Sequence, residues 1–180
     1  MLLLIGASAS GKTEIAKLLI NRYHMEKLVT YTTRPKRSGE IHGKDYYFLD
    51  YSDFKEKEKN GFFLETSTYQ GNWYGTSFSN ASENSVLIVD PDGANAIYRA
   101  LNEEVVIYLI ETPRDLRRAR MIIRGDDEEI IESRLSSDDA YFNQSRLFHI
   151  DNVFENSHQS LEKLADTIYS AYIKKRLNSN

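Results

Sequence analysis

Cysteine is absent from the 180 residues, and the chain contains only three prolines and one tryptophan. Without cysteine there are no disulfides, cysteine-type zinc sites or thiol nucleophiles, which fits a reducing compartment. The opening run MLLLI is too short for a signal peptide and has no basic residues before it. No run approaches the roughly 20 apolar residues that cross a bilayer. These absences predict a soluble, cytoplasmic protein that does not bind a membrane.

An excess of basic residues is missing as well. The chain has 23 Lys and Arg against 27 Asp and Glu, with a formal charge of -4 and a pI near 5.6. This balance supplies no general attraction for nucleic acid, so an anionic ligand must be held by local groups. The four histidines lack metal-ligand spacing. We expect small-molecule partners, no nucleic acid, and a monomer or a homodimer.

Short apolar runs alternate with helical patterns. The runs LLLI, VLIVD, VVIYLI and a weaker HIDNVF are β-type, and helical patterns separate them. This alternation predicts an α/β fold with a buried parallel sheet, and the length predicts one domain. Between about residues 31 and 84 the pattern changes to short aromatic strands, a charged helix and glycine turns. We expect this block to be an insertion over the sheet edge.

The segment GASASGKT fits the pattern G-x-x-x-x-G-K-[ST]. An apolar strand ends just before it and a helical pattern begins just after, which is the context that a phosphate-binding loop needs. Glycines let the backbone N–H groups and a helix N-terminus point at one anion. A plain glycine turn would not need both Lys12 and Thr13, which are predicted to bridge the outer phosphates and to ligate Mg²⁺. The predicted ATP-binding residues of this loop are Gly6, Ala7, Ser8, Ala9, Ser10, Gly11, Lys12 and Thr13.

Asp90 follows the apolar run VLIV at the carboxyl end of a predicted strand, where α/β sheets place their ligands. It can orient a metal shell, as an acid does in P-loop enzymes. It can also be an ordinary strand-end turn acid before Pro91. The phosphate loop favours the first interpretation, so the predicted metal ligands are Thr13 and Asp90.

Cations and tyrosines are concentrated in YTTRPKRSGEIHGKDYYF, residues 31–48. Arg34 and Arg37 can make planar, bidentate contacts with a phosphate, and Tyr46 can add a neutral hydroxyl donor. Tyr74 in GNWYGT is a further donor between glycines. Loops rich in Arg and Lys are often only solvated. With a phosphate loop in the same chain, these residues are a candidate site for the phosphoryl acceptor.

This stretch resembles the guanylate kinase signature. The later FLETSTYQGNWYGT is similar to that family's acid-then-YG[ST] segment, and the phosphate loop, RMIIRG, ESRL and VFENS occur in the family's order over nearly the whole chain. The resemblance implies a P-loop NTPase-type three-layer fold with a five-stranded parallel sheet, an inserted small, mostly-β GMP-binding subdomain and a helical lid. It implies a single domain, 1–180, with a core of residues 1–30 and 85–180, the GMP-binding subdomain at about 31–84 and the lid at about 120–140. The signature positions that match are Thr32, Thr33, Arg34, Arg37, Glu40, Gly43, Tyr46 and Phe48.

The activity that the resemblance implies is transfer of the γ-phosphoryl group of Mg·ATP to GMP, with dGMP as a further candidate acceptor. A carboxylate at Glu65 can accept from both N1–H and N2–H of guanine, whereas adenine would leave it facing a lone pair. From the residues alone, Glu65 could be an exposed strand acid and the tyrosines could be core residues with solvated hydroxyls. The resemblance assigns the phosphate of GMP to Arg34, Arg37, Tyr46 and Tyr74, and its base to Thr30, Glu65 and Thr76.

The segment DLRRARMIIRGDDEEIIESRL places Arg120 and Arg124 at i and i+4, with Arg134 following. The resemblance implies that this is the lid, whose arginines fold over the transferring phosphoryl group and exclude water. A salt-bridged helix is the other interpretation. The predicted catalytic residues are therefore Lys12, Arg120, Arg124 and Arg134, and the resemblance adds Asn156 as an ATP contact.

The chain departs from the family pattern at Ala7, Ala9 and Trp73, and more seriously at two further places. Ile88 stands where relatives carry an acid, and Asp92 is in the wrong register to replace it; the segment after Thr76 is also short. Two alternatives stay open: an interaction module that has lost catalysis, and a kinase of this fold acting on another small phosphate such as ribose 1,5-bisphosphate. The intact Lys12 and Thr13 argue against the first, and the complete GMP-type signature argues against the second.

Overall fold

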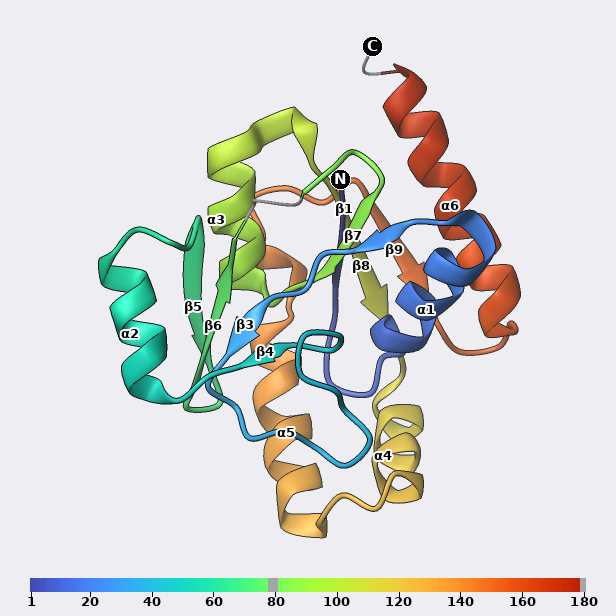
Figure 1. Cartoon of the computed structure of the whole chain (residues 1–180). Helices are drawn as coiled ribbons and strands as arrows, with labels where there is room; N and C mark the ends of the chain where they lie inside the picture. The colour runs from blue at the N-terminus through green and yellow to red at the C-terminus, as the bar shows by residue number, and fades with distance from the viewer. Residues whose placement is uncertain (78–80, 179–180) are drawn as a thin grey trace.

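A five-stranded parallel sheet forms the centre of the chain (Figure 1). The computed structural model describes residues 1–77 and 81–178. Every neighbouring pair of strands in this sheet is parallel, in the order β2-β7-β1-β8-β9. The strands are β1 (Leu2–Ile5), β2 (Glu26–Lys27), β7 (Ser85–Ile88), β8 (Val106–Glu111) and β9 (Asn152–Glu155). The predicted α/β class and five-stranded parallel sheet are confirmed.

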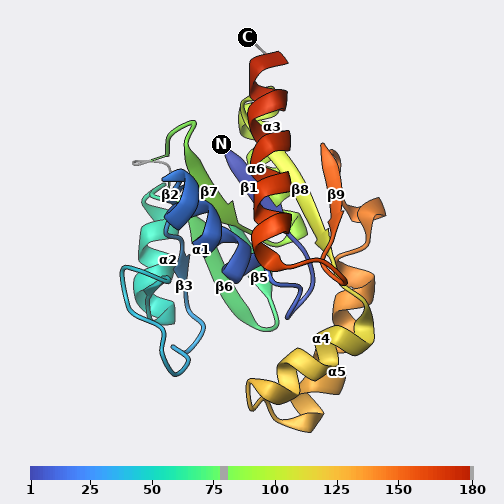
Figure 2. The same cartoon turned by 90° about the vertical axis from the view of Figure 1, so that its right-hand side faces the viewer.

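Helices cover both faces of this sheet because the side chains of β1 alternate between two apolar clusters. Leu2 and Leu4 pack with α1 (Lys12–Tyr23) and α6 (Leu161–Asn178), whereas Leu3 and Ile5 pack with α3 (Pro91–Leu101). All four side chains are fully buried, as a strand between two helical layers requires. Figure 2 shows α6 in front of the sheet and α3 behind it, which confirms the predicted three-layer fold.

The second sheet has four strands in the order β4-β3-β6-β5 and lies beside the first. The hairpin β5–β6 closes through Gln70 and Gly71, which both have positive φ, as a tight two-residue hairpin turn requires. Its strands are β3 (Tyr31–Thr32), β4 (Tyr47–Phe48), β5 (Glu65–Tyr69) and β6 (Asn72–Thr76), and helix α2 spans Tyr51–Lys59. The short strands and the charged helix therefore occur where the sequence predicted them, while the subdomain bounds at 31 and 84 stay a prediction.

Two helices, α4 (Arg114–Ile123) and α5 (Glu128–Tyr141), project below the parallel sheet (Figure 2). They pack on each other through a small apolar cluster of Met121, Ile131 and Leu135. Short 3₁₀ helices lie at Asn102–Glu104 and Gln144–Arg146. The helical pair covers the segment predicted to be the lid.

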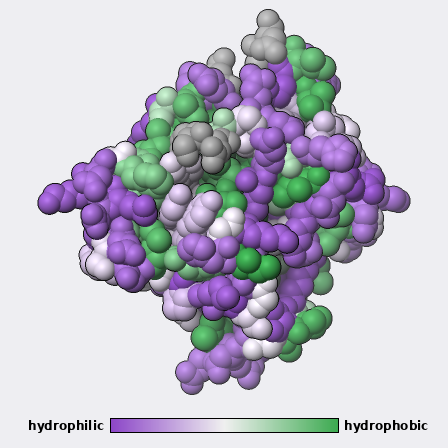
Figure 3. Space-filling model, in the orientation of Figure 1, coloured by the Kyte–Doolittle hydropathy of each residue, from purple (hydrophilic) through white to green (hydrophobic). Residues whose placement is uncertain are grey.

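The surface on the side seen in Figure 3 is mainly hydrophilic, with apolar side chains in small groups. Within residues 1–77 and 81–178, no helix combines the length and the apolar character that crossing a membrane requires.

Candidate active site

The phosphate loop, residues 6–13, runs from β1 into α1 and is packed so closely that two positions require glycine. A Cβ on Gly6 would lie 2.3 Å from the carbonyl oxygen of Ile110. Gly11 has a φ of +99°, and a Cβ there would lie 2.4 Å from Nδ2 of Asn156. Gly6 also has a positive φ, +152°, so contact and backbone conformation together exclude a side chain at both positions.

The carboxyl ends of β8 and β9 hold this loop in place. Nδ2 of Asn156 donates a hydrogen bond of 2.8 Å to the carbonyl oxygen of Ser10, and the hydroxyl of Thr112 donates to the same oxygen at 3.1 Å. Asn156 is buried. The side chain of Asn156, which was predicted to contact ATP, thus contacts the backbone of the phosphate loop in this structure.

Lys12 lies half-buried inside the loop. Its ammonium group donates to the carbonyl oxygens of Gly6 and Ala7, the second at 2.8 Å, and to Oγ of Ser10 at 3.2 Å. Loss of solvent lowers the pKa of Lys12 to about 8. Thr13 is exposed at the start of α1. The loop therefore carries an ammonium group and an exposed hydroxyl on neighbouring residues, the groups that phosphate and metal binding use.

A cavity of about 500 Å³ extends from the phosphate loop to the second sheet. Residues from both sheets and from the lid line it, so the fold brings together segments far apart in the sequence. The predicted site residues that line it are Gly6, Ser8, Ala9, Lys12, Thr13, Thr30, Arg34, Arg37, Tyr46, Glu65, Tyr74, Thr76, Asp90, Arg124 and Arg134.

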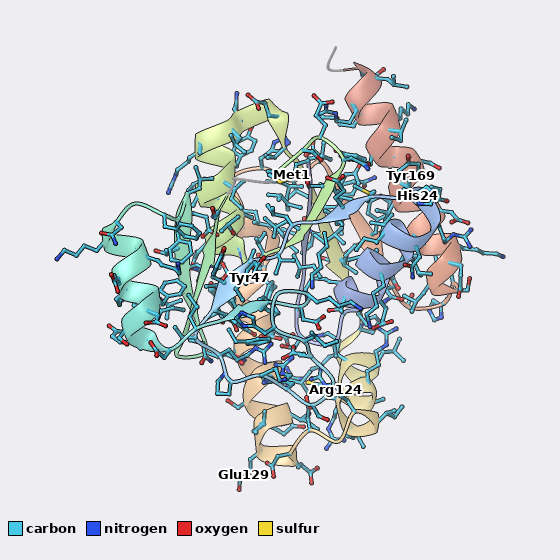
Figure 4. All side chains as sticks on the ribbon, viewed as in Figure 1. Met1, His24, Tyr47, Arg124, Glu129 and Tyr169 are labelled. Carbon is cyan, nitrogen blue, oxygen red and sulfur yellow. The ribbon has the colours of Figure 1, made fainter. Side chains whose placement is uncertain are left out.

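Four arginines make one side of this cavity strongly cationic. Burial lowers the pKa of Arg37, and the positive charges of Arg34, Arg134 and Arg124 lower it further. Glu40 shapes the loop by accepting from the guanidinium of Arg34 and from the backbone N–H of Arg37, both at 2.7 Å. Figure 4 shows nitrogen-bearing side chains gathered near Arg124, between β4 and α5. Such a cluster is unfavourable by itself and is stabilised by an anion.

One acid between α4 and α5 pairs with two of these arginines. Asp126 pairs with Arg124 and, at 3.3 Å, with Arg134. Helix α4 ends at Ile123, so Arg124 lies at the helix end and lines the cavity. Arg120, one turn earlier, instead donates to the carbonyl oxygen of Ala9 at 3.2 Å and contacts Asn156. The i,i+4 geometry holds in the backbone, where the N–H of Arg124 donates to the carbonyl oxygen of Arg120 at 3.1 Å. The two side chains nevertheless have different partners, Ala9 and Asn156 for Arg120 and Asp126 for Arg124.

Tyr46 and Tyr74 line the cavity, with their ring centroids 6.3 Å apart. Burial raises the pKa of Tyr46 to about 12, so its hydroxyl stays a neutral donor. The guanidinium of Arg34 lies 5.4 Å from the centroid of the Tyr46 ring. The side chains predicted to hold a monophosphate are therefore neighbours.

Glu65 lines the cavity and is only 8% exposed. Among the described residues nothing hydrogen-bonds to its Oε2 atom. Burial raises the pKa of Glu65 to about 7, and the nearby Asp90 carboxylate adds to the shift. Thr30 and Thr76 are buried on the same cavity wall. Glu65 is thus a buried acid with an unused acceptor, not an exposed strand residue.

Asp90 occupies the N-cap of α3 and makes two hydrogen bonds. Its Oδ1 accepts from the N–H of Gly93 at 2.8 Å, and its Oδ2 accepts from the hydroxyl of Ser67 at 2.7 Å. The turn-acid role is therefore present, and the metal role stays a prediction. Within the described part of the chain, no three His, Cys, Asp or Glu side chains are grouped to hold a metal. One hydroxyl and one carboxylate fit Mg²⁺ that arrives with a nucleotide, because phosphates and water supply most of its ligands.

The two more serious departures from the family pattern have clear positions. Ile88 lines the cavity, so an apolar side chain stands where relatives carry an acid. Asp92 accepts from the hydroxyl of Tyr141 at 3.0 Å and from Arg146 at 3.1 Å, away from the cavity, as its register predicted. Part of the shortened segment after Thr76, residues 78–80, lies outside the described residues.

The sequence reasoning missed Asp138 and Tyr69. Asp138 is fully buried on α5, accepts from the N–H of Ser8 at 2.6 Å and also accepts from the hydroxyl of Tyr69. A signal existed, because Asp138 lies on the same helix face as the buried Ile131 and Leu135. An acid at an apolar position of an amphipathic pattern indicates a specific partner.

A phosphate loop that faces an arginine- and tyrosine-lined acceptor cavity below a helical lid is typical of P-loop kinases of nucleoside monophosphates. The family model described as guanylate kinase matches residues 1–171. The guanylate kinase of Anaplasma phagocytophilum is 35% identical over 178 residues, which cover 93% of this chain and 83% of that protein. That of Neisseria meningitidis serogroup A is 33% identical, covering 94% of this chain and 86% of that protein.

A solved structure supports the same assignment. The crystal structure of guanylate kinase from Anaplasma phagocytophilum matches with a TM-score of 0.70 and 30% identity, covering 97% of this chain and 85% of that one. The chain belongs to the guanylate kinase family.

Proposed function

We propose that this cavity binds Mg·ATP at the phosphate loop and GMP against the second sheet, and transfers the γ-phosphoryl group to give ADP and GDP. The observation that carries the choice of acceptor is the unpartnered Oε2 of the buried Glu65. A buried polar atom without a partner is costly, and a ligand that supplies donors removes the cost. Guanine presents N1–H and N2–H on one edge, whereas adenine presents an acceptor at N1.

The phosphate of GMP would lie among the guanidinium groups of Arg34 and Arg37 and the hydroxyls of Tyr46 and Tyr74, which together line the cavity. These groups are bidentate or neutral donors and suit a phosphate that must keep its charge on the attacking oxygen. Because that oxygen is already anionic, no general base is required. Positioning and charge neutralisation carry the reaction.

In the transfer step, the attacking oxygen of GMP forms a bond to the γ-phosphorus of ATP while the bond to the leaving ADP oxygen breaks. Lys12, Arg124 and Arg134 line the cavity, and they would neutralise the charge that spreads over the transferring group. Mg²⁺ would neutralise part of the same charge, and Thr13 and Asp90 are the residues that would hold it. Arg120 contributes by bracing the phosphate loop at Ala9.

A coupled assay of ADP release tests the acceptor. GMP, dGMP, AMP, UMP, CMP and ribose 1,5-bisphosphate are compared at equal concentration with Mg·ATP. We expect GMP to stimulate release most strongly and dGMP to follow. Stimulation by ribose 1,5-bisphosphate alone would identify a different kinase, and binding of GMP without any turnover would identify an interaction module.

Other predictions about this chain stay predictions. They are a cytoplasmic location, no binding of nucleic acid or membrane, and a monomeric or homodimeric state. Gel filtration of the full chain with light scattering distinguishes the two oligomeric states.

A further inference from the structure

A buried carboxylate joins the lid to the phosphate loop. One oxygen of Asp138 on α5 accepts from the backbone N–H of Ser8 at 2.6 Å, and the other accepts from the hydroxyl of Tyr69. Asp138 is 0% exposed. It is also the charged group that acts most strongly on the ammonium group of Lys12. A negative charge of the lid therefore uses donors of the loop that is expected to bind phosphate.

The same donors serve a phosphate, because backbone N–H groups and a lysine are what such loops offer to an anionic oxygen. A carboxylate is costly to bury unless hydrogen bonds and opposite charge compensate for the lost water. For Asp138 the compensation comes from Ser8, Tyr69 and Lys12. A phosphate that draws Lys12 and the loop N–H groups to itself removes this compensation and adds like charge. The two anions therefore oppose each other at the loop.

Tyr69 extends this link to the acceptor side of the cavity. Side chains alternate along a strand, so Glu65, Ser67 and Tyr69 lie on one face of β5. The ring of Tyr69 also stacks on Tyr141 of α5, with centroids 5.2 Å apart and planes 20° from parallel. The pair of Asp138 and Tyr69 thus connects the lid helix, the phosphate loop and the strand that carries Glu65.

We propose that Asp138 is a positioning residue that competes with the phosphates of Mg·ATP for the phosphate loop and docks α5 on that loop until ATP releases it. The proposal rests on the proposed function and deepens it. Arg134 lies one turn before Asp138 on the same helix and lines the cavity. Release of Asp138 therefore frees the helix that carries Arg134, and the arrival of ATP sets the position of the lid.

Equilibrium binding of Mg·ATP and of magnesium tripolyphosphate, without GMP, tests this competition in the full chain. Asp138→Asn keeps the shape and the acceptor oxygen but removes the charge. We expect it to bind both ligands about tenfold more tightly than the wild type. Tripolyphosphate has no base or sugar and no acceptor is present, so the result does not depend on which acceptor the enzyme phosphorylates.

Asp139→Asn is the matched control, because it makes the same charge change one residue further along α5. Asp139 pairs with Arg114 and Arg117 instead of the phosphate loop. We expect its affinity for both ligands to stay within about twofold of the wild type. Equal tightening in both variants would show a general effect of net charge and would overturn the proposal, as would weaker binding by Asp138→Asn.

Steady-state kinetics separate positioning from a merely structural role. In Asp138→Asn we expect a lower KM for Mg·ATP with the KM for GMP within about twofold of the wild type. A loss of structure would raise both KM values together and would contradict the proposal. Tyr69→Phe is the second variant; it keeps the ring stack and the charge but removes one donor to Asp138. It is expected to tighten tripolyphosphate binding by about threefold, and unchanged or weaker binding would also overturn the proposal.

Discussion

The hydroxyl of Ser67 donates a hydrogen bond of 2.7 Å to the carboxylate of Asp90, and this bond joins the second sheet to the N-terminus of α3. Ser67 lies two residues after Glu65 on the same face of β5. Asp90 at the same time caps α3 through the N–H of Gly93. The acid predicted to bind metal thus also positions the strand that carries Glu65, and variants of Asp90 must separate the two roles.

Asp90→Asn is expected to separate them, because asparagine caps a helix as well as aspartate does but is a poorer ligand for Mg²⁺. We expect little loss of stability in urea unfolding and a severalfold rise in the Mg²⁺ concentration that gives half-maximal activity. Asp90→Ala also removes the cap and should lose about 1 kcal/mol of unfolding free energy. An unchanged Mg²⁺ dependence in Asp90→Asn would leave Asp90 as a turn acid only.

Glu65 gives the reaction a predicted pH dependence. Because its pKa is raised to about 7, the carboxylate is protonated below that pH and ionised above it. Only the ionised form accepts from both donors of guanine, so kcat/KM for GMP should rise with pH and level off above about pH 8. Glu65→Gln should lose this rise and reduce the preference for GMP over AMP by about 10²-fold or more. An unchanged preference would remove Glu65 from base recognition.

Glu65 should also change the stability of the fold with pH. Its folded pKa of about 7 lies above the ordinary value of 4.5. The folded state therefore holds the proton more tightly, and stability falls as pH rises from about 4.5 through 7. At pH 8 we expect Glu65→Gln to be more stable than the wild type by an amount on the order of 2–3 kcal/mol, shrinking toward zero near pH 4.

Urea unfolding at several pH values measures this difference. Glu58→Gln is the control, because Lys55 and Thr66 hold the pKa of Glu58 below its usual value. It should gain no stability at pH 8. A gain of equal size in both variants would mean that reduced negative charge, and not the burial of Glu65, is responsible.

The sequence predicted four strands of the parallel sheet, including the edge strand β9, and missed the other edge strand, β2. β1 and the first five residues of β8 are buried because helices cover both sides of the sheet. β2 has only Glu26 and Lys27, paired at the sheet edge with β7. Two polar residues carry no periodic signal, so the position of an edge strand is set by the neighbour with which it pairs.

The candidate site also contains residues that the sequence predicted and contacts that it missed. The positions of Lys12 and Arg34 in the cavity wall could be predicted because each residue belongs to a sequence motif with fixed spacing. The contact of Asp138 with Ser8 joins residues 130 positions apart, and only the docking of α5 creates it. Arg120 and Arg124 likewise have different partners, Ala9 for the first and Asp126 for the second, and the i,i+4 spacing alone does not show which partner each side chain takes.

Gly11→Ala should abolish tight binding of ATP. The added Cβ would meet Nδ2 of Asn156 at 2.4 Å in a backbone conformation with a φ of +99°. Asn156 also holds the carbonyl oxygen of Ser10, so relieving the contact distorts the loop. We expect a loss of about 2 kcal/mol or more in unfolding free energy and at least about a 10²-fold loss of affinity for Mg·ATP.

Gly61→Ala is the matched control for this substitution. Gly61 also has a positive φ, +67°, but its Cβ would meet nothing within 4 Å. Backbone strain alone should cost about 1 kcal/mol and leave ATP affinity unchanged. Similar losses of ATP affinity in both variants would show that the contact with Asn156 is not the cause.

Binding of Mg·ATP should be coupled to uptake of a proton by Lys12. Loss of solvent lowers the pKa of Lys12 to about 8, so the ammonium form is only partly populated near pH 8.5. A phosphate beside it favours the charged form and raises the pKa again. Calorimetric titrations in two buffers of different ionisation enthalpy should show net uptake near pH 8.5 and almost none near pH 6.5, where Lys12 is already protonated.

Lys12→Arg tests whether this proton belongs to Lys12, because a guanidinium group stays charged throughout this range. The Lys12→Arg variant should bind Mg·ATP without proton uptake. It should also turn over more slowly, because a planar guanidinium group does not fit where the compact ammonium group lies inside the loop. Lys12→Ala should lose turnover altogether. If the arginine variant took up as many protons as the wild type, the titrating group would be another one, and the lowered pKa of Lys12 would have no part in binding ATP.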